Sequence, residues 1–240
     1  MITVILTAYN RPETLKAQIA SIENQTIKPK EIWIWYNKGD KEQIKIDNKN
    51  IKVIYASHNF KFHGRFSLAL LAQTEYIAIF DDDCLPQPKW FENCIDTIKK
   101  CNGILGTSGV TLLGTKYKPN KKYGWTSNHN ESTVQVDLVG HNWFFKKEWL
   151  KYMWMEEPVS WENGEDIQFS ALCQKYGNIN TYVPPHPIKD KSLWGNNIEH
   201  ATKWGNDKNA THLHEKNHYS LRDSICEAYI KKGWKTINSK

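Results

Sequence analysis

Three consecutive carboxylates follow a short apolar run in the first third of the chain. Residues 76–80 have the composition of a buried strand, and Asp81, Asp82 and Asp83 come directly after them. Crowded carboxylates repel one another and do not all stay ionised at low cost unless a cation lies near them. Oxygen ligands suit hard divalent ions, so the triplet predicts a site where Mn²⁺ or Mg²⁺ is shared with substrate phosphates. The alternative is a helix-capping loop, for which one Asp would suffice.

Other candidate residues are fewer and weaker. Arginine occurs only at Arg11, Arg65 and Arg222 in a chain that otherwise uses lysine. Such positions favour a rigid fork for phosphate or carboxylate. An acidic pair, Glu165 and Asp166, precedes a helical pattern and would also suit an ordinary helix N-terminus.

Alternating strand and helix patterns would position these residues. Apolar β-branched runs predict strands at 2–8, 31–36, 51–56 and 75–80, and amphipathic patterns predict helices at 12–22, 66–72 and 90–100. This order is typical of a doubly wound, mostly parallel α/β sheet flanked by helices. Ligands of such sheets bind outside the carboxyl ends of the strands, where the Asp triplet falls.

The second half is less regular. Strand-like patterns cover 103–113 and 134–145, the latter interrupted at Gly140 and His141, while 112–133 has loop composition. Helices are expected at 167–175 and 221–232, with an irregular Asn-, Lys- and His-rich segment between them. No repeat and no long linker divides the 240 residues, so we expect a single domain.

Composition excludes several classes of protein. The net charge is +6, but the lysines are scattered and form no nucleic-acid-binding arm. The five cysteines form no CxxC pair, which is typical of a reduced, intracellular protein. No run of 18 apolar residues is present, so we expect no integral membrane segment. We therefore expect a cytoplasmic protein, at most peripheral to a membrane.

The Asp triplet resembles the metal-binding Asp-x-Asp motif of GT-A fold glycosyltransferases. Residues 4–12 are similar to the first strand and turn of family-2 enzymes, and 33–37 resemble their second strand. The resemblance implies a GT-A-like fold, a donor half at 1–110, an acceptor half at 111–240 and a nucleoside-diphosphate sugar donor, most often UDP-linked. It implies Asp83 as metal ligand and these donor contacts: Thr7, Ala8, Tyr9, Arg11, Asn37, Arg65, Asp81 and Asp82.

The acidic pair resembles the Glu-Asp motif of the same enzymes. In the inverting members the motif Asp takes the proton of the acceptor hydroxyl, which implies Asp166 as the base. Glu165 would orient the loop or bind acceptor hydroxyls. GT-A enzymes often take a further metal ligand from a C-terminal histidine, which implies His212 or His214, although such a His-x-His pair would also suit zinc or an ordinary surface.

Residues 124–127 and 138–143 resemble the acceptor side of these folds. Aromatic faces stack on sugar rings, and the resemblance implies that the glycan or other acceptor meets Trp125, His141, Trp143 and Trp161. Packing remains the default role for any one of the 11 tryptophans.

Three alternatives remain. Asn37 and the Gly64-Arg65-Phe66 segment resemble exostosin-like transferases, which would imply a retaining reaction instead of inversion. A nucleotidyltransferase would also bind nucleotide and Mg²⁺, but the first turn lacks its glycines. A non-catalytic carbohydrate-binding protein would use the tryptophans without needing the Asp triplet.

Overall fold

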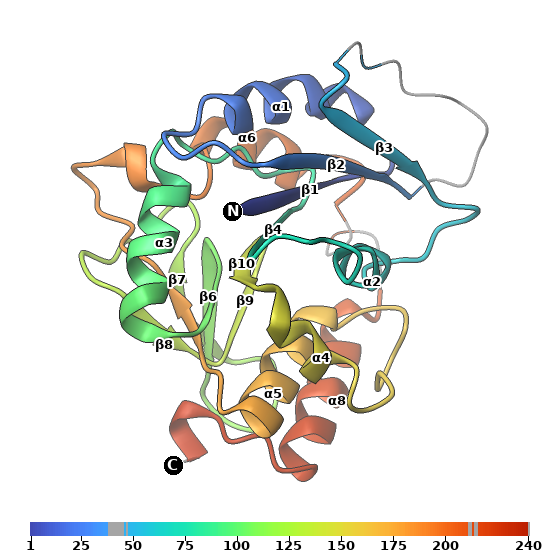
Figure 1. Cartoon of the computed structure of the whole chain (residues 1–240). Coiled ribbons are helices and arrows are strands. Elements are labelled where there is room, and N and C mark those ends of the chain that lie inside the picture. The colour runs from blue at the N-terminus through green and yellow to red at the C-terminus, as the bar shows by residue number, and fades with distance from the viewer. Residues whose placement is uncertain (38–45, 47, 211–212, 214–215, 240) are drawn as a thin grey trace.

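Eight strands form one mixed sheet in the computed structural model, which describes residues 1–37, 46, 48–210, 213 and 216–239 (Figure 1). The strand order is β3-β2-β1-β4-β10-β5-β11-β8. The first four are parallel: β1 (Ile2–Ala8), β2 (Glu31–Tyr36), β3 (Ile51–Tyr55) and β4 (Tyr76–Phe80). Their carboxyl ends therefore meet at one edge, as the sequence predicts.

The rest of the sheet reverses direction. β10 (Asn142–Lys146) runs antiparallel between β4 and β5 (Ile104–Leu105). β11 (Thr181–Val183) is parallel to β5, and β8 (Val134–Val136) closes the edge antiparallel. A separate antiparallel sheet holds β7 (Asn120–Gly124), β6 (Ser108–Leu112) and β9 (Leu138–Gly140). β7 lies where the sequence predicted a loop, because a Lys- and Asn-rich edge strand has no apolar alternation.

Most predicted helices are confirmed within a few residues. The short 3₁₀ turn η1 (Pro12–Thr14) leads into α1 (Leu15–Glu23), and the others include α2 (Gly64–Ala69), α3 (Trp90–Cys101) and α5 (Glu165–Gly177). Proline at the first position of η1 suits a helix start. Asn102 ends α3 in the left-handed conformation that asparagine tolerates best among non-glycine residues.

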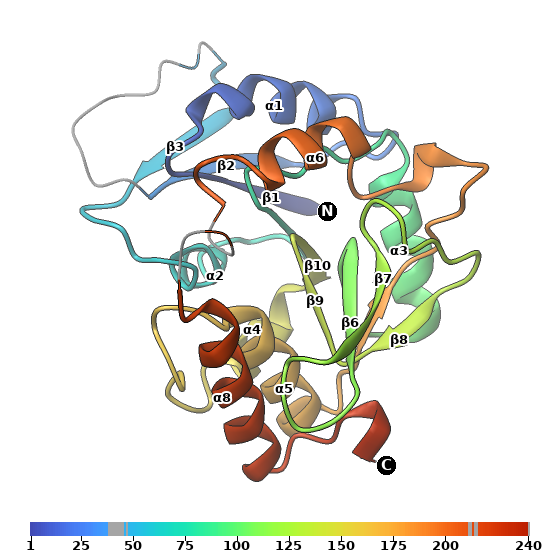
Figure 2. The same ribbon diagram turned by 180° about the vertical axis from the view of Figure 1, so that it is seen from behind.

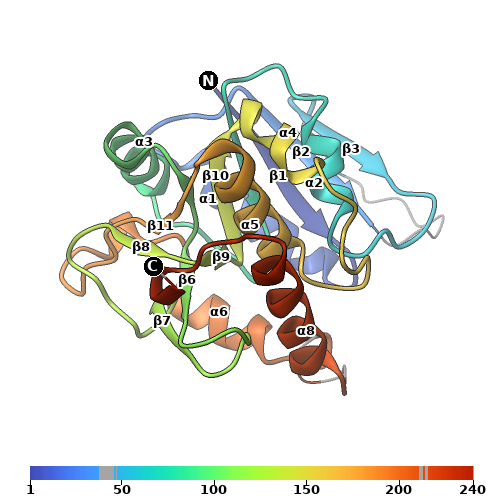
Figure 3. The same ribbon diagram turned by 90° about the horizontal axis from the view of Figure 1, so that it is seen from below.

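The C-terminal segment contains a helix that the sequence did not predict. α6 (Ile198–Gly205) is capped at its N-terminus by Asn197, whose side chain accepts a hydrogen bond from the backbone N–H of His200. It passes in front of β1 and β2 in Figure 2. α8 (His218–Lys231) begins three residues earlier than expected and lies beside α5 (Figure 3). Shorter helices are α4 (Leu150–Met153), η2 (Lys147–Trp149), η3 (Lys191–Leu193) and η4 (Ile237–Ser239).

Apolar side chains from both halves of the chain share the core. One cluster joins residues of β1, β2, β4 and α3 with residues of β10, α4 and α5. A second joins β6 and β9 with α5 and α8, for example Leu112, Leu138, Leu172 and Ile225. No helix in the described part of the chain is both long and apolar enough to cross a bilayer.

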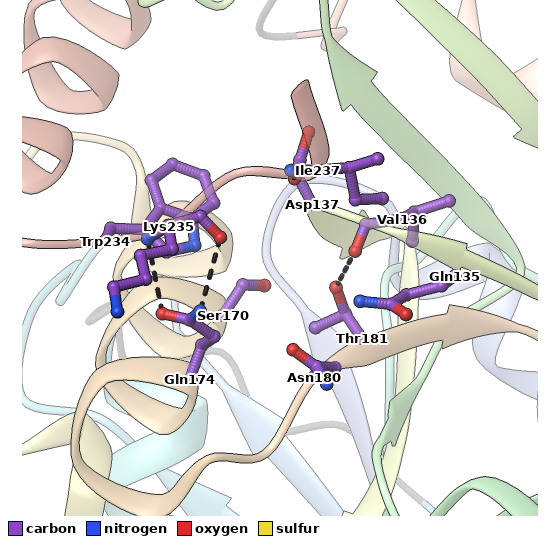
Figure 4. Close-up of a pocket in the computed structure, with 10 residues that line it drawn as sticks. All are labelled: Gln135, Val136, Asp137, Ser170, Gln174, Asn180, Thr181, Trp234, Lys235 and Ile237. Carbon is purple, nitrogen blue, oxygen red and sulfur yellow. Dashed lines mark hydrogen bonds between the residues drawn. The ribbon is translucent and has the colours of Figure 1, made fainter. Parts of the chain in front are cut away.

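A small polar pocket lies between α5, β8, β11 and the C-terminal segment (Figure 4). Its side chains bond mainly to the protein itself. Gln174 exchanges two hydrogen bonds with the backbone of Lys235, at 3.2 and 3.3 Å, and Thr181 donates to the carbonyl of Val136 at 2.6 Å. Asp137 accepts from the backbone N–H of Ile237 at 2.7 Å. These bonds fix the C-terminus, so the pocket is structural.

Candidate active site

The three aspartates after β4 each meet a different basic side chain. Asp82 Oδ1 lies 2.5 Å from Arg11 Nη1, and Asp83 Oδ2 lies 3.6 Å from His141 Nδ1. The partners are Arg65 for Asp81, Arg11 for Asp82 and His141 for Asp83. The carboxylates therefore do not converge on one point, and the crowding that the sequence implies is relieved by three separate pairs.

Arg65 joins the end of β4 to the start of α5. Its guanidinium is 3% exposed and pairs with Asp81 on one side and, through Nη2, with Glu165 Oε1 at 2.8 Å on the other. The group lies over the ring of Trp143, 4.7 Å from its centroid. A planar fork can hold two carboxylates at once, which a lysine ammonium cannot do in this geometry. Arg65 thus fixes the distance between the triplet and the acidic pair.

Arg11 joins the turn after β1 to the segment that follows α6. Besides Asp82 it binds Asp207, with Nε 3.0 Å from Oδ2 and a second contact through Nη2. At 5% exposure this guanidinium is almost enclosed. No local pattern in the sequence indicates Asp207, because its pairing with Arg11 spans nearly the whole chain.

The three aspartates differ in their preference for charge. Burial raises the pKa of Asp82 to about 7, because Arg11 offsets only part of the cost and Asp83 adds repulsion. Burial also raises the pKa of Asp81 against the opposing effect of Arg65. Burial acts in the same direction on Asp83, but the contact with His141 outweighs it and lowers the pKa. Asp83 is therefore the aspartate whose ionised form this edge favours most.

His141 reaches Asp83 because of the strand register. β10 runs antiparallel to β4 with Asn142 opposite Phe80, so the residue before Asn142 lies beside the residue after Phe80. The carbonyl of His141 accepts from the backbone N–H of Asp81 at 3.0 Å and from Cys84 Sγ at 2.9 Å. The family resemblance implied that His141 contacts the acceptor, whereas the structure places its ring against the Asp triplet.

The acidic pair opens α5 as predicted. Gly164 precedes the helix with φ +88°, and a Cβ there would lie 2.5 Å from Ile225 Cδ1 of α8, so only glycine fits without a shift. Burial, with the charge of Asp166, raises the pKa of Glu165 to about 7 despite Arg65. Two acidic groups at a helix N-terminus are favoured by the helix dipole.

Asp166 is held by the third arginine. Its carboxylate accepts from Arg222 of α8 at 2.6 and 3.1 Å and from the backbone N–H of Ile167 at 2.9 Å. Asp166 lies beside the end of β9. A Cβ placed on Gly140 would be 3.7 Å from Asp166 Oδ2. His141 directly follows Gly140, so Asp166 and the Asp83–His141 pair lie near two adjacent residues of the chain. The sequence marked Arg222 as a candidate for binding phosphate or carboxylate but did not indicate that its partner is Asp166.

The expected nucleotide side is only partly exposed. Thr7 Oγ1 is buried and has no hydrogen-bond partner within the described part of the chain, while Tyr9 is 37% exposed. Ala8 is fully buried. Asn37 is 4% exposed and binds the chain after β3: it donates to the carbonyl of Lys61 at 2.9 Å and accepts from the N–H of Phe60 at 2.9 Å. In this structure Asn37 shapes that loop.

The tryptophans expected on the acceptor side separate into two groups. Trp125 stacks on His141 with centroids 3.7 Å apart, and Trp161 is 53% exposed beside His63. Trp143 is 2% exposed, donates to the carbonyl of Val139 and packs under Arg65, so an acceptor has no access to it. That assignment is corrected: Trp143 belongs to the core.

Metal-ligating groups converge at one place in the described residues. Asp83, Cys84 and His141 each offer a ligand atom, and these atoms lie within 4.8 Å of one another. Burial and the neighbouring carboxylates raise the pKa of the Cys84 thiol well above its usual range, so it remains a thiol and donates to His141. His212 and His214, the histidines expected to bind metal, lie outside the described residues.

Comparisons with known proteins agree with this arrangement. The family model described as Glycosyl transferase family 2 matches residues 3–154. A protein of Haemophilus influenzae named as an uncharacterized glycosyltransferase is 26% identical over 148 residues, which cover 55% of this chain and 46% of that protein. Chondroitin synthase of Escherichia coli is 24% identical over 223 residues, 73% of this chain and 32% of that one. The chain thus spans less than half the length of these relatives.

Solved structures of TarS from S. aureus share the fold. One matches with a TM-score of 0.52 and 16% identity, covering 77% of this chain and 36% of that one. TarS 1–349 in complex with UDP matches with a TM-score of 0.52 and 14% identity, covering 77% and 60%. The fold is therefore the GT-A-like one that the motifs resemble, and the family model covers well over half of the sequence. The chain belongs to glycosyl transferase family 2.

Proposed function

We propose that this chain transfers a sugar from a nucleoside-diphosphate sugar, UDP-linked, to a hydroxyl group of a glycan. The observation that carries the proposal is that Asp83 lies against His141 and Asp166 lies beside Gly140, which are adjacent residues of the chain. Membership of family 2 supports the reaction class, and the UDP complex of TarS and the name of the E. coli relative support the donor and a glycan product.

The donor would bind across the carboxyl ends of β1 and β4. Thr7, near the end of β1, supplies a buried hydroxyl that has no hydrogen-bond partner among the described residues, and Tyr9 after the strand supplies an exposed ring. Ala8 would contribute only backbone to that wall. Arg11 and Arg65 hold Asp82 and Asp81 in place, so we assign these four residues to positioning the donor and to contacts with its ribose and sugar.

The residues at Asp83 fit a divalent cation. The carboxylate is favoured in its ionised form and keeps 12% side-chain exposure at the edge where the diphosphate would lie. When bound, Mn²⁺ or Mg²⁺ would stabilise the negative charge of the departing diphosphate. Asp81 and Asp82 are engaged with arginines, so Asp83 is the triplet member that we assign to the ion.

Asp166 is our candidate for the base that accepts the acceptor proton. A carboxylate needs only to receive a proton from a hydroxyl that is already forming its bond to the sugar. Arg222 holds both of its oxygens and fixes their direction. Glu165 acts through Arg65 and not on the acceptor directly. This arrangement supports inversion; a retained product configuration would favour the exostosin-like alternative.

We assign the whole chain to one transferase domain. Core residues are shared between 1–110, the proposed donor half, and 111–240, the proposed acceptor half. Trp125 and the exposed Trp161 are the aromatic side chains that we assign to the acceptor. They flank the site from β7 and from the loop before α5.

Turnover of a UDP-sugar panel with Mn²⁺ and with EDTA tests the proposal. Asp83→Ala should lower metal-dependent release of UDP at least about 10³-fold, because a bound metal supplies several kcal/mol of charge stabilisation. Its unfolding midpoint should change little, since relief of repulsion offsets the lost contact with His141. Asp96→Ala on the exposed face of α3 is the matched control. Wild-type, EDTA-sensitive turnover in Asp83→Ala would contradict the assignment. A separate assay with a nucleoside triphosphate and a sugar 1-phosphate tests the alternative, because release of pyrophosphate from that pair would indicate a nucleotidyltransferase.

A further inference from the structure

We propose that His141 Nδ1 is the nitrogen ligand of the divalent cation at Asp83, and that this site therefore takes Mn²⁺ in preference to Mg²⁺. The inference rests on the proposed function, because it concerns the same ion. It assigns the nitrogen ligand to a histidine that the sheet itself positions, instead of to His212 or His214. It also assigns His141 a role at the metal instead of at the acceptor.

The separation of the two side chains fits ligands of one ion. His141 Nδ1 and Asp83 Oδ2 are 3.6 Å apart, longer than a good hydrogen bond. Two bonds of about 2.0–2.2 Å from one ion place their ligand atoms about 2.8–3.1 Å apart at the octahedral angle and about 3.3–3.6 Å apart at the tetrahedral angle. An octahedral ion could therefore bind both atoms after they approach each other by about 0.5 Å, which small side-chain rotations would supply.

The imidazole is held in place before any ion binds. Its ring is stacked on Trp125 at an interplanar angle of 21°, and its carbonyl is fixed by Asp81 and Cys84. Both His141 and Trp125 have positive φ, at +66° and +62°. Such backbone is costly for a bulky residue and persists where the surroundings enforce it, often at functional sites.

The ligand chemistry selects among ions. Cys84 Sγ is hydrogen-bonded to the backbone carbonyl of His141 at 2.9 Å, so the ligand atoms that we assign to the ion are one carboxylate oxygen and one imidazole nitrogen. Mg²⁺ favours oxygen ligands and retained water, whereas first-row transition ions accept imidazole readily. Mn²⁺ binds imidazole and also favours octahedral coordination by oxygen, so the oxygens of a diphosphate would complete its ligand set.

Pulsed electron paramagnetic resonance on the Mn²⁺ complex with UDP tests the proposal, because a directly bound nitrogen gives a ¹⁴N coupling. His141→Gly removes the ring and suits the positive φ, and His141→Asn keeps polarity at a position that asparagine also tolerates. Both variants should lose the coupling. Calorimetry should show Mn²⁺ affinity falling at least about tenfold, as changes around metal sites do, with Mg²⁺ affinity changing by less than about threefold.

The controls separate this inference from the proposed function. His58→Ala, at an exposed histidine, should keep both coupling and affinity. If Asp83→Ala abolishes Mn²⁺ binding while His141→Gly keeps the coupling and the affinity, the nitrogen ligand lies elsewhere and only this inference falls. A wild-type complex without ¹⁴N coupling overturns it in the same way. If the wild type binds no Mn²⁺ with UDP present, the metal part of the proposed function falls as well.

Discussion

Two groups of charged side chains in this protein use similar residues in opposite ways. At the active-site edge, buried carboxylates have raised pKa values, about 7 for both Asp82 and Glu165. At the far end of α5, Glu156 binds Lys175 at 2.5 Å, Lys232 at 3.1 Å and the hydroxyl of Tyr176. Burial opposes its charge, but the hydrogen bonds from these partners outweigh burial and lower the pKa of Glu156 to about 2.

The two groups differ in what their charges do: those around Glu156 stabilise the fold, and those at the site serve binding or chemistry. The Glu156 group joins the chain after α4 to the last turn of α5 and the C-cap of α8, so its charges hold helices together. At the site, acidic groups outnumber nearby arginines. Keeping them close and buried costs desolvation and repulsion free energy, which apolar side chains at the same edge of the sheet would not cost. Perturbed carboxylates of this kind mark sites where charge is needed for binding or chemistry.

The largest expected effect is on catalysis at Asp166. Asp166→Asn keeps the size of the side chain and part of its contact with Arg222 but removes the proton acceptor. A positioned general base contributes about 10²–10⁴-fold, so kcat should fall by that factor while UDP and Mn²⁺ affinities change by no more than about threefold. Steady-state kinetics and calorimetry would measure both.

Glu156→Gln is the control from the other group and should leave kcat unchanged. If Asp166→Asn instead lost Mn²⁺ binding but kept turnover at saturating Mn²⁺, Asp166 would be a metal ligand and the base would be another residue. The anomeric configuration of the wild-type product gives an independent reading, because inversion requires such a base on the acceptor side.

The next effect is on stability at Glu165. Its folded pKa of about 7 lies above the usual 4.5, so the folded state favours the protonated form. This stabilisation is complete below pH 4.5 and is lost as pH rises through 7. Glu165→Gln mimics the protonated group, so the variant should match the wild type at pH 4.5 and exceed it by about 3 kcal/mol at pH 8.

Denaturant unfolding at several pH values would measure this difference. A Glu165→Gln variant less stable than the wild type at pH 8 would show that the ion pair with Arg65 outweighs burial. The comparison between the two charged groups would then fail, because both would be stabilised by their charges.

The sequence predicted the parts of the site that depend on local pattern. β4 is apolar and ends at the Asp triplet, and α5 begins at the acidic pair, so both motifs were found where the structure has them. His141 and Arg222 could be seen in the sequence but not placed. The first depends on the antiparallel register of β10, and the second on how α8 packs against α5.

The sequence also did not indicate which of the tryptophans near the site are buried. Trp125 directly follows Gly124 and Trp143 follows Gly140 by three residues, yet the first stacks beside the site and the second fills the core under Arg65. Asp207 pairs with Arg11 across almost the whole chain, a contact that no local pattern indicates. What sequence reasoning missed is therefore long-range pairing, which only the assembled sheet determines.

The smallest expected effect is at Glu156 and has the opposite sign to that at Glu165. Its folded pKa of about 2 lies below the usual 4.5, so its stabilisation is present above pH 4.5 and lost as pH falls through 2. The side chain is 16% exposed and its lysine partners are more open, so solvent screening reduces the gain to about 1 kcal/mol. Glu156→Gln should lower the free energy of unfolding by that amount at pH 7 and by nothing near pH 2, with less loss in high salt. Chemical denaturation across this pH range measures the difference. Equal stability of variant and wild type at pH 7 would show that the lysine pairs contribute nothing, and that the two groups differ only in burial.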